Sequence, residues 1–156
     1  MNSILFVCLG NICRSPTAKA VFDHKLSQAE LQVLTDSAGT GDWHVGKPPD
    51  PRSQAFAHAW GVDISDQRAR RVCVADFERF DRIYAMDRSN LDQLQRLAPT
   101  ECRARVDLVM NLAPDYGLEE VPDPYYGGDQ GFQRVIDMLS AAADRLIEEL
   151  QRRPRS

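Results

Sequence analysis

The stretch ILFVCLGNICRSP, residues 4–16, contains the pattern of a buried strand, a tight loop and the start of a helix. Its first five residues are all apolar, which is typical of a strand buried on both faces of a parallel sheet. Gly10 and Asn11 end that run, and Ser15-Pro16 predicts an N-cap followed by proline at the first helical position. Apolar residues then recur at helical spacing, at Ala18, Val21, Phe22 and Leu26.

The rest of the chain repeats this alternation. We expect strands at residues 31–37, 82–86 and 104–110, and helices at 51–60, 75–79, 89–97 and along the apolar repeat from 135 to 150. Two loops rich in glycine or proline, 40–51 and 113–128, separate them. The pattern predicts an α/β fold: a single-domain, flavodoxin-like three-layer sandwich with four or five parallel strands flanked by helices.

Composition narrows the class of protein. The 156 residues fit one domain spanning 1–156, with about 151–156 as a frayed tail. A net charge of −4 and the lack of a basic stripe argue against nucleic-acid binding. Neither a bilayer-spanning apolar run nor a signal peptide is recognisable, so we expect a cytoplasmic protein that does not bind membranes. We also expect a monomer. In a reducing cytosol, all four cysteines should be free thiols.

Candidate site residues stand where several of the expected strands end. Cys8, the Ser37-Ala38-Gly39 segment and Asp87 each come directly after a strand. Because ligands bind beyond the carboxyl ends of parallel strands, we expect these residues to meet at one edge of the sheet.

The spacing of Cys8 and Arg14, with five residues between them, indicates phosphate chemistry. A loop that enters a helix directs backbone N–H groups into one concavity, which binds anions. Gly10 would allow the backbone conformation of such a cradle, and Arg14 can hold phosphate oxygens in a bidentate grip. The same surroundings stabilise a thiolate on Cys8, and Ser15 could donate a hydrogen bond to it. That thiolate would lie in line to attack phosphorus.

A tyrosine leaving group also needs a proton donor, and Asp123 is the candidate. Asp-Pro alone is more often a turn initiator, but Tyr125 and Tyr126 follow and can form the wall of a slot for an aromatic ring. Trp43, in the loop after the second strand, could form the facing wall, and Ile12 offers an apolar surface beside it.

The sequence resembles the low-molecular-weight protein tyrosine phosphatase family over nearly its whole length. Residues 7–16, 36–39 with 42–52, 85–91 and 123–128 carry the likeness. The resemblance implies hydrolysis of phosphotyrosine in proteins, with neither metal nor cofactor. It also implies roles for individual residues: Cys8 as nucleophile, Arg14 as phosphate ligand, Asp123 as general acid and base, and supporting roles in or behind the loop for Leu9, Gly10, Asn11, Ile12, Cys13, Ser15 and Asp87.

Three positions need separate comment. Gln67 stands where many family members carry a histidine that supports the loop, so the support here is expected to differ. His44 flanks Trp43 and is a candidate for the rim of the site. Cys13 could trap an oxidised Cys8 as a reversible disulfide, a role implied by the pair that the family shares; the alternative is a small side chain at the base of the loop.

Other functions remain open at this point. Arsenate reductases of related fold share the loop but need relay cysteines, which are missing near Asp87. Protein arginine phosphatases usually carry threonine where this chain has Ile12. A phosphotyrosine-binding module without catalysis would be expected to lack Cys8, Arg14 or Asp123, and all three are present.

Overall fold

The computed structural model describes residues 1–124 and 128–152, and at its centre lies a parallel four-stranded sheet. The strands β1 (Ser3–Cys8), β2 (Leu34–Gly39), β3 (Arg82–Ala85) and β4 (Arg105–Leu108) follow the order β2-β1-β3-β4. β1 therefore pairs with β2 on one side and with β3 on the other. The carboxyl end of β1 is thus the topological switch point, where ligands bind in open sheets of this type.

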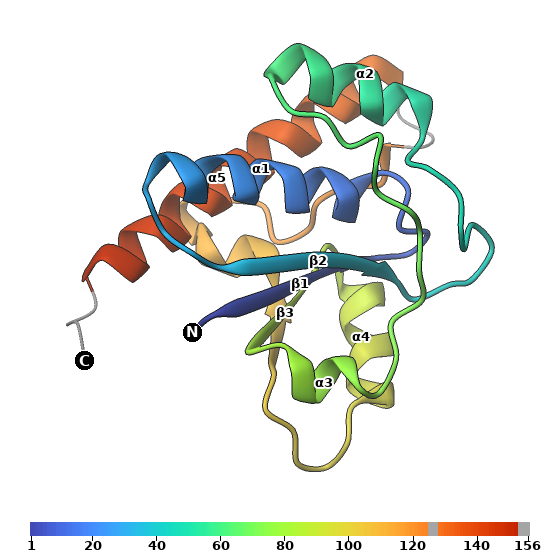
Figure 1. Ribbon diagram of the computed structural model, residues 1–156, viewed down its shortest axis with the longest axis vertical. Helices are drawn as coiled ribbons and strands as arrows, with labels where there is room; N and C mark the ends of the chain where they lie inside the picture. The colour runs from blue at the N-terminus through green and yellow to red at the C-terminus, as the bar shows by residue number, and fades with distance from the viewer. Residues whose placement is uncertain (125–127, 153–156) are drawn as a thin grey trace.

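Helices cover both faces of the sheet, which confirms the expected single-domain sandwich of three layers. One face is covered by α1 (Arg14–Gln28) and α5 (Gly128–Arg152), and the other by α3 (Asp76–Arg79) and α4 (Arg88–Leu97). α2 (Pro51–Trp60) packs outside this layer, against α5 (Figure 1). Among the described helices, none is both long and apolar enough to cross a membrane.

The uninterrupted apolar run of β1 is explained by burial on both sides, since all six of its residues are buried. Ile4 and Phe6 pack into the cluster under α1 and α5, whereas Leu5 and Val7 pack into the cluster with α3 and α4. Each fully buried side chain of this size stabilises the fold by about 1.5–3 kcal/mol. The strand that carries Cys8 is therefore held from both faces.

Several boundaries differ from those expected. β2 begins at Leu34 instead of residue 31, because Leu34 lies opposite Ser3 at the start of β1 and Leu31 is hydrogen-bonded back to Leu26 of α1. β4 ends at Leu108, where a 3₁₀ turn over Val109–Leu112 begins. α5 already starts at Gly128, and it continues through residues 151 and 152, which were expected to belong to a frayed tail.

The expected cap of α1 is also wrong. The helix starts at Arg14 with Cys13 at the N-cap position, and no side chain caps it. Ser15 lies inside the first turn and points its hydroxyl to Cys8 instead. Pro16 is still tolerated there, because the first N–H groups of a helix have no intrahelical partner.

α2 has the expected bounds, since Asp50 caps its start and Gly61 ends it in a left-handed conformation. The amide of Asp50 donates to the carbonyl of Ile12 (2.8 Å). On the other side of α2, the Phe56 ring stacks on Phe132 of α5, with centroids 5.7 Å apart and planes 7° from parallel. α2 therefore contacts both the loop after β1 and the first turns of α5.

Candidate active site

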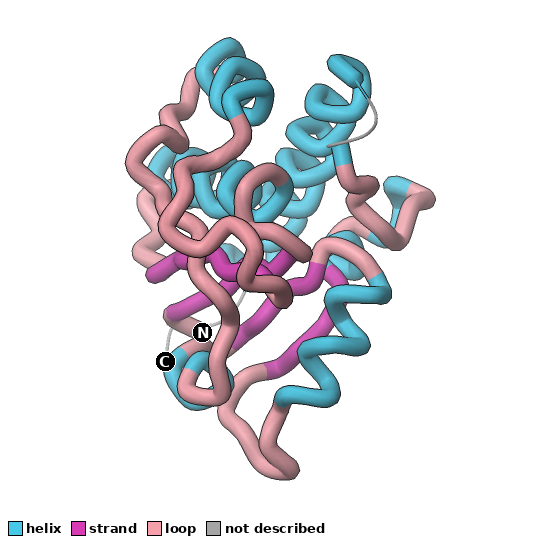
Figure 2. The backbone as a smooth tube through the Cα atoms, turned by 90° about the vertical axis from the view of Figure 1, so that its right-hand side faces the viewer, coloured by secondary structure: helices cyan, strands magenta, loops and turns pink. Residues whose placement is uncertain are grey.

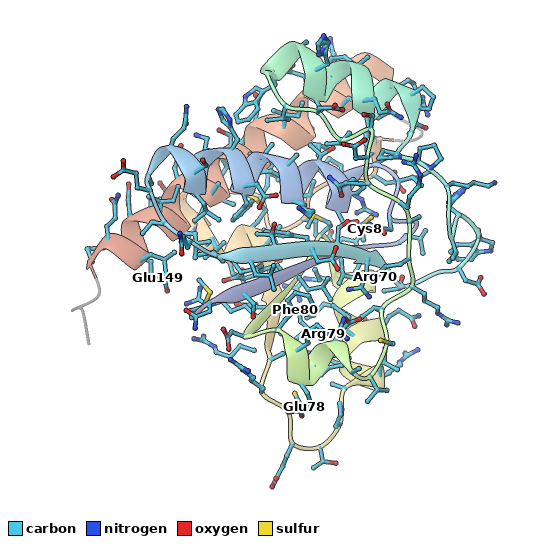
Figure 3. All side chains as sticks on the ribbon, viewed as in Figure 1. Cys8, Arg70, Glu78, Arg79, Phe80 and Glu149 are labelled. Carbon is cyan, nitrogen blue, oxygen red and sulfur yellow. The ribbon has the colours of Figure 1, made fainter. Side chains whose placement is uncertain are left out.

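A cavity of about 310 Å³ lies at the carboxyl end of β1. Figure 2 looks onto this edge, where several loops gather in front of the strands. Figure 3 labels Cys8 at this edge and Glu149 at the opposite end of the molecule. The lining residues come from three segments far apart in the sequence: Cys8, Leu9, Gly10, Ile12, Cys13, Arg14, Trp43, His44 and Asp123.

The loop over residues 8–15 makes its turn at Asn11 and not at Gly10. Asn11 has a φ of 57°, in the left-handed region that asparagine tolerates better than most residues. At Gly10, a Cβ would lie 3.0 Å from Cδ2 of the His44 side chain, a tight contact that His44 would have to relieve. Gly39, at the end of β2, is needed because a Cβ there would lie 2.7 Å from the backbone carbonyl oxygen of Leu9.

The sulfur of Cys8 is buried and has two polar neighbours in its own loop. The backbone N–H of Asn11 donates to Sγ at 3.3 Å, and Oγ of Ser15 lies 3.0 Å from it. Nδ2 of Asn11 donates to that same Oγ at 2.8 Å, and the one hydrogen of Ser15 has two acceptors within reach, the sulfur of Cys8 and the carbonyl of Ala38 at 3.3 Å. Both groups can thus donate to a sulfur anion, as the sequence analysis expected of Ser15.

A further chain of hydrogen bonds holds Asn11 in place. Its second Nδ2 hydrogen goes to Oγ of Ser37 (2.9 Å), and its Oδ1 accepts from the backbone N–H of Arg70 (2.9 Å). Ser37 donates onward to Oε1 of Gln67 (3.1 Å), and Nε2 of Gln67 donates to the carbonyl of Pro16 (2.9 Å). Gln67 therefore connects the end of β2 with the first turn of α1.

Arg14 is 3 % exposed and lies between two acidic side chains. Its Nη1 donates to Oδ2 of Asp87 (2.6 Å) and to the carbonyl of Val121 (3.0 Å). Burial alone would lower the pKa of Arg14, but the neighbouring Cys8 and the hydrogen bond with Asp87 outweigh it and raise that pKa. The guanidinium consequently stays charged, and the cavity keeps a positive group beside the sulfur.

Asp123 reaches the same cavity from the 113–124 segment. Its Oδ2 lies 3.8 Å from Nη2 of Arg14, and its side chain is 35 % exposed. Val121 fixes this end of the segment, because its N–H donates to the carbonyl of Met86 (2.8 Å) while its carbonyl accepts from Arg14. The carboxyl group of Asp123 thus faces the cavity that also contains Cys8.

The rim contains the expected aromatic residue. Trp43 lines the cavity although its side chain is 65 % exposed, and His44 lies beside it. The Trp43 ring lies against Gly41, since a Cβ there would lie 1.8 Å from the ring and the exposed side chain would have to move. Ile12 lines the cavity as predicted. Tyr125 and Tyr126, which were predicted to form a wall of the ring slot, lie outside the described residues.

Cys13 lines the cavity too, but its thiol differs from a reactive one. Burial raises its pKa to about 12, and the nearby Asp50, Cys8 and Asp123 act in the same direction. Cys13 is therefore a neutral thiol at physiological pH. Its disulfide with Cys8 stays a prediction.

Some supporting groups were not predicted from the sequence. The carbonyl of Val121 and the amide of Arg70 are backbone groups, which have no signature in the sequence. Ser37 and Gln67 were named from the sequence, but the hydrogen bond between them was not predicted. Within the described residues, no three His, Cys, Asp or Glu side chains gather in a way that could hold a metal ion.

Comparison with known proteins agrees with this geometry. The family model described as "Low molecular weight phosphotyrosine protein phosphatase" matches residues 3–156. A protein of that name from Schizosaccharomyces pombe is 46% identical over 132 residues, covering 83% of this chain and 84% of its own.

Solved structures are similar over nearly the whole chain. A protein tyrosine phosphatase from Entamoeba histolytica, with Hepes in its active site, superposes with a TM-score of 0.91 at 39% identity, covering 97% of each chain. A structure described as "DARP, drosophila arginine phosphatase" has a TM-score of 0.92 at 31% identity, covering 99% of this chain and 100% of its own.

Proposed function

Because the chain belongs to the low molecular weight phosphotyrosine protein phosphatase family, we propose that it hydrolyses phosphotyrosine in proteins through a phosphocysteine on Cys8. The observation that carries this proposal is one cavity that contains the Cys8 sulfur, the buried Arg14 and the Asp123 carboxyl group. Relatives named as protein tyrosine phosphatases support the substrate class.

In the first step, the Cys8 thiolate attacks phosphorus opposite the tyrosine oxygen. The S–P bond forms while the P–O bond to the ring breaks, and protonated Asp123 gives its proton to the departing phenolate. The backbone N–H of Asn11 and the hydroxyl of Ser15 stabilise the thiolate before the attack. Arg14 stabilises the negative charge on the phosphoryl oxygens as the bonds change.

In the second step, water replaces tyrosine. The Asp123 carboxylate takes a proton from the water, and the water oxygen attacks phosphorus as the S–P bond breaks. Inorganic phosphate leaves and the Cys8 thiolate returns, so atoms and charge balance without a metal or cofactor. Asp87 acts through Arg14, because the 2.6 Å ion pair fixes the guanidinium at the cavity wall.

The apolar rim accounts for tyrosine as the substrate. Ile12 and Trp43 line the entrance and offer surfaces for a phenyl ring, with His44 beside them. We assign Tyr125 and Tyr126 to the same ring pocket by family resemblance. A short phosphoserine side chain would leave its phosphorus away from the buried sulfur. We further propose that the protein works as a cytoplasmic monomer on phosphoproteins, not on nucleic acids or membranes.

Arginine dephosphorylation is the second candidate, favoured by the likeness to the Drosophila arginine phosphatase. Against it stands Ile12, an apolar side chain in the cavity at a position where such enzymes usually carry threonine. A planar phenyl ring fits this surface better than a guanidinium, which needs hydrogen-bond acceptors.

The test is a substrate profile with phosphotyrosine, phosphoserine and phosphoarginine peptides of otherwise identical sequence. We expect turnover of phosphotyrosine alone, and mass spectrometry of acid-quenched enzyme should find one phosphoryl group on Cys8. Cys8→Ser should lose activity by up to about 10⁶-fold, the scale seen when a covalent nucleophile is removed, and still bind phosphate. Faster turnover of phosphoarginine, or activity that survives Cys8→Ser, would contradict the proposal.

A further inference from the structure

A second hollow, of about 510 Å³, opens beside α4. One wall is the chain over residues 71–74, which passes the end of β2, where Arg71 forms a bridge with Gly39, and then leads to α3. The other wall consists of residues 93, 96 and 97 of α4. We call this hollow the α4 groove. Figure 1 shows the first wall passing the end of β2 and reaching α3 next to α4.

The α4 groove borders a strip of chain that is hydrogen-bonded to the loop of the active-site cavity. Thr40 lines the groove, and its backbone N–H donates to the carbonyl of Cys8 (2.9 Å). The next residue, Gly41, donates to the carbonyl of Leu9 (2.9 Å), which is itself a lining residue of the cavity. The strip of chain over residues 39–41 is thus bonded to the cavity loop at the point where it borders the groove.

The groove carries positive charge in a protein whose net charge is −4. Arg71 and Arg96 line it from opposite walls, both are exposed, and neither forms an ion pair with another described residue. The adjacent Arg70 differs, because Asp36 and Asp76 hold its guanidinium at 3.0 Å each. No Asp or Glu is among the lining residues that the structure describes, and Asp92, one turn before Arg96, makes no ion pair with it.

The same groove exposes apolar surface. Val74 is 51 % exposed and Leu97 is 37 % exposed, and they contribute from opposite walls. A free anion would bind the two arginines but would leave the apolar surface of Val74 and Leu97 exposed to water. An extended peptide with acidic and apolar side chains matches both features, because its side chains alternate along the groove.

We propose that the α4 groove binds an acidic, extended segment of the same phosphoprotein whose phosphotyrosine enters the cavity; this inference rests on the proposed function. A substrate chain must leave the cavity over its rim, and the border at Thr40 leads it between Arg71 and Arg96. The groove therefore contributes to the choice among phosphotyrosine sites, by recognising acidic residues that flank the target.

The experiment compares three phosphotyrosine peptide series, with acidic, neutral amide or basic residues on the amino or the carboxyl side, and 4-nitrophenyl phosphate as a substrate without flanks. We expect wild type to prefer acidic flanks on one side by about 3–10-fold in kcat/KM, the range of two exposed charge pairs. The preference should shrink as salt is raised, because exposed charges are screened.

The variant Arg71→Glu/Arg96→Glu should abolish or reverse this preference and leave 4-nitrophenyl phosphate turnover unchanged. The control is Arg105→Glu, matched in charge to the single variants Arg71→Glu and Arg96→Glu, since Arg105 is also exposed and lies at the start of β4, at the other end of the strands. Equal turnover of acidic and neutral peptides by wild type would overturn the proposal. So would an equal loss in the Arg105→Glu control, because the effect would then belong to the overall charge.

Binding to Cys8→Ser, measured by fluorescence anisotropy, separates this proposal from the proposed function. If wild type turns over no aryl phosphate, the proposed function fails. The dissociation constants of acidic and neutral phosphopeptides with Cys8→Ser still show whether the α4 groove binds acidic segments. If the acidic peptide binds equally well without its phosphate group, the groove serves a separate acidic partner and the inference is wrong.

Discussion

The loop over residues 8–15 and the segment over residues 113–124 meet at one cavity, but they are held in different ways. The loop is contiguous, follows a fully buried strand, and has Asn11 and Ser15 hydrogen-bonded at its centre. The segment brings Asp123 from more than a hundred residues away and leaves its side chain 35 % exposed, 3.8 Å from Arg14. The part that would bind phosphate is thus buried and heavily bonded, whereas the part that would move the proton is more open.

This difference fits the tasks that we assign to the two regions. A phosphate site gains from donors fixed before the substrate arrives, because no reorganisation is then needed during reaction. A proton donor that later activates water needs solvent access. We therefore expect changes in the loop to affect binding and stability, and changes at Asp123 to affect the chemical step alone.

The largest effect that separates the two regions is expected from Asp123→Ala. It should lower kcat for phosphotyrosine peptides by about 10²–10⁴-fold, the usual contribution of a general acid, with little change in phosphate affinity. The loss should be smaller for aryl phosphates whose leaving groups depart without a proton.

The matched control for that change is Asp115→Asn, in the same segment, where the exposed Asp115 pairs with Arg145 outside the cavity. It should leave kcat unaltered. A loss at Asp123 that is equal for all leaving groups would remove this residue from the role of acid.

A smaller effect, on stability as well as binding, is expected from Asp87→Asn. Asparagine can still cap α4, where Asp87 accepts from the N–H of Asn90, so the change isolates the ion pair with Arg14. The buried guanidinium would lose its nearest carboxylate, and the free energy of unfolding should fall by about 1.5–3 kcal/mol, the range of a hydrogen bond to a charged group. Urea unfolding with and without phosphate measures this.

Added phosphate should recover part of the lost stability, because the anion then faces Arg14. An unfolding free energy equal to that of wild type would mean that Val121 and Asp123 suffice to hold the guanidinium.

The smallest effect is expected from Gln67→Leu. It removes the acceptor for Ser37 and the donor to Pro16 at similar side-chain volume, and kcat/KM should fall by about 3–10-fold, the range of one or two hydrogen bonds. Gln67→His should restore activity and add a histidine whose unperturbed pKa of about 6.5 brings a further dependence on pH.

Gln54→Leu is the control for this change, since Nε2 of Gln54 also donates to a proline carbonyl, that of Pro49 (2.8 Å), but outside the cavity. Equal kcat/KM in Gln67→Leu and Gln54→Leu would contradict a positioning role for Gln67.

Local patterns predicted much of this molecule. The apolar run of β1, the loop after it and the bounds of α2 are set by neighbouring residues, and they were found where expected. The start of β2 was wrong because it depends on where β1 begins, which is a matter of register between distant strands. The start of α5 was missed because Gly128 and Gly131 are poor helix formers that carry no apolar period.

In the active site, too, features set by neighbouring residues were predicted and features set by distant contacts were not. Cys8 and Arg14 were recognisable from their spacing, and Asp123 from the two tyrosines that follow it and from the family resemblance. Gly10 was expected to allow the backbone conformation of the cradle, but the residue with positive φ is Asn11, whose side chain is held by Ser15, Ser37 and Arg70. Three-dimensional contacts such as these decide between two residues that are both suited to a turn.

The parallel rings of Phe56 and Phe132 have a practical consequence for spectroscopy. Protons above the face of a neighbouring ring resonate upfield, and this shift changes steeply with ring separation. Phe56 belongs to the helix that begins beside Ile12, while Gly131, next to Phe132, lies so close to Pro124 that a Cβ there would be 3.5 Å from Pro124 Cα. Two aromatic resonances would thereby register relative displacement of the two sides of the cavity during a phosphate titration, without any attached label.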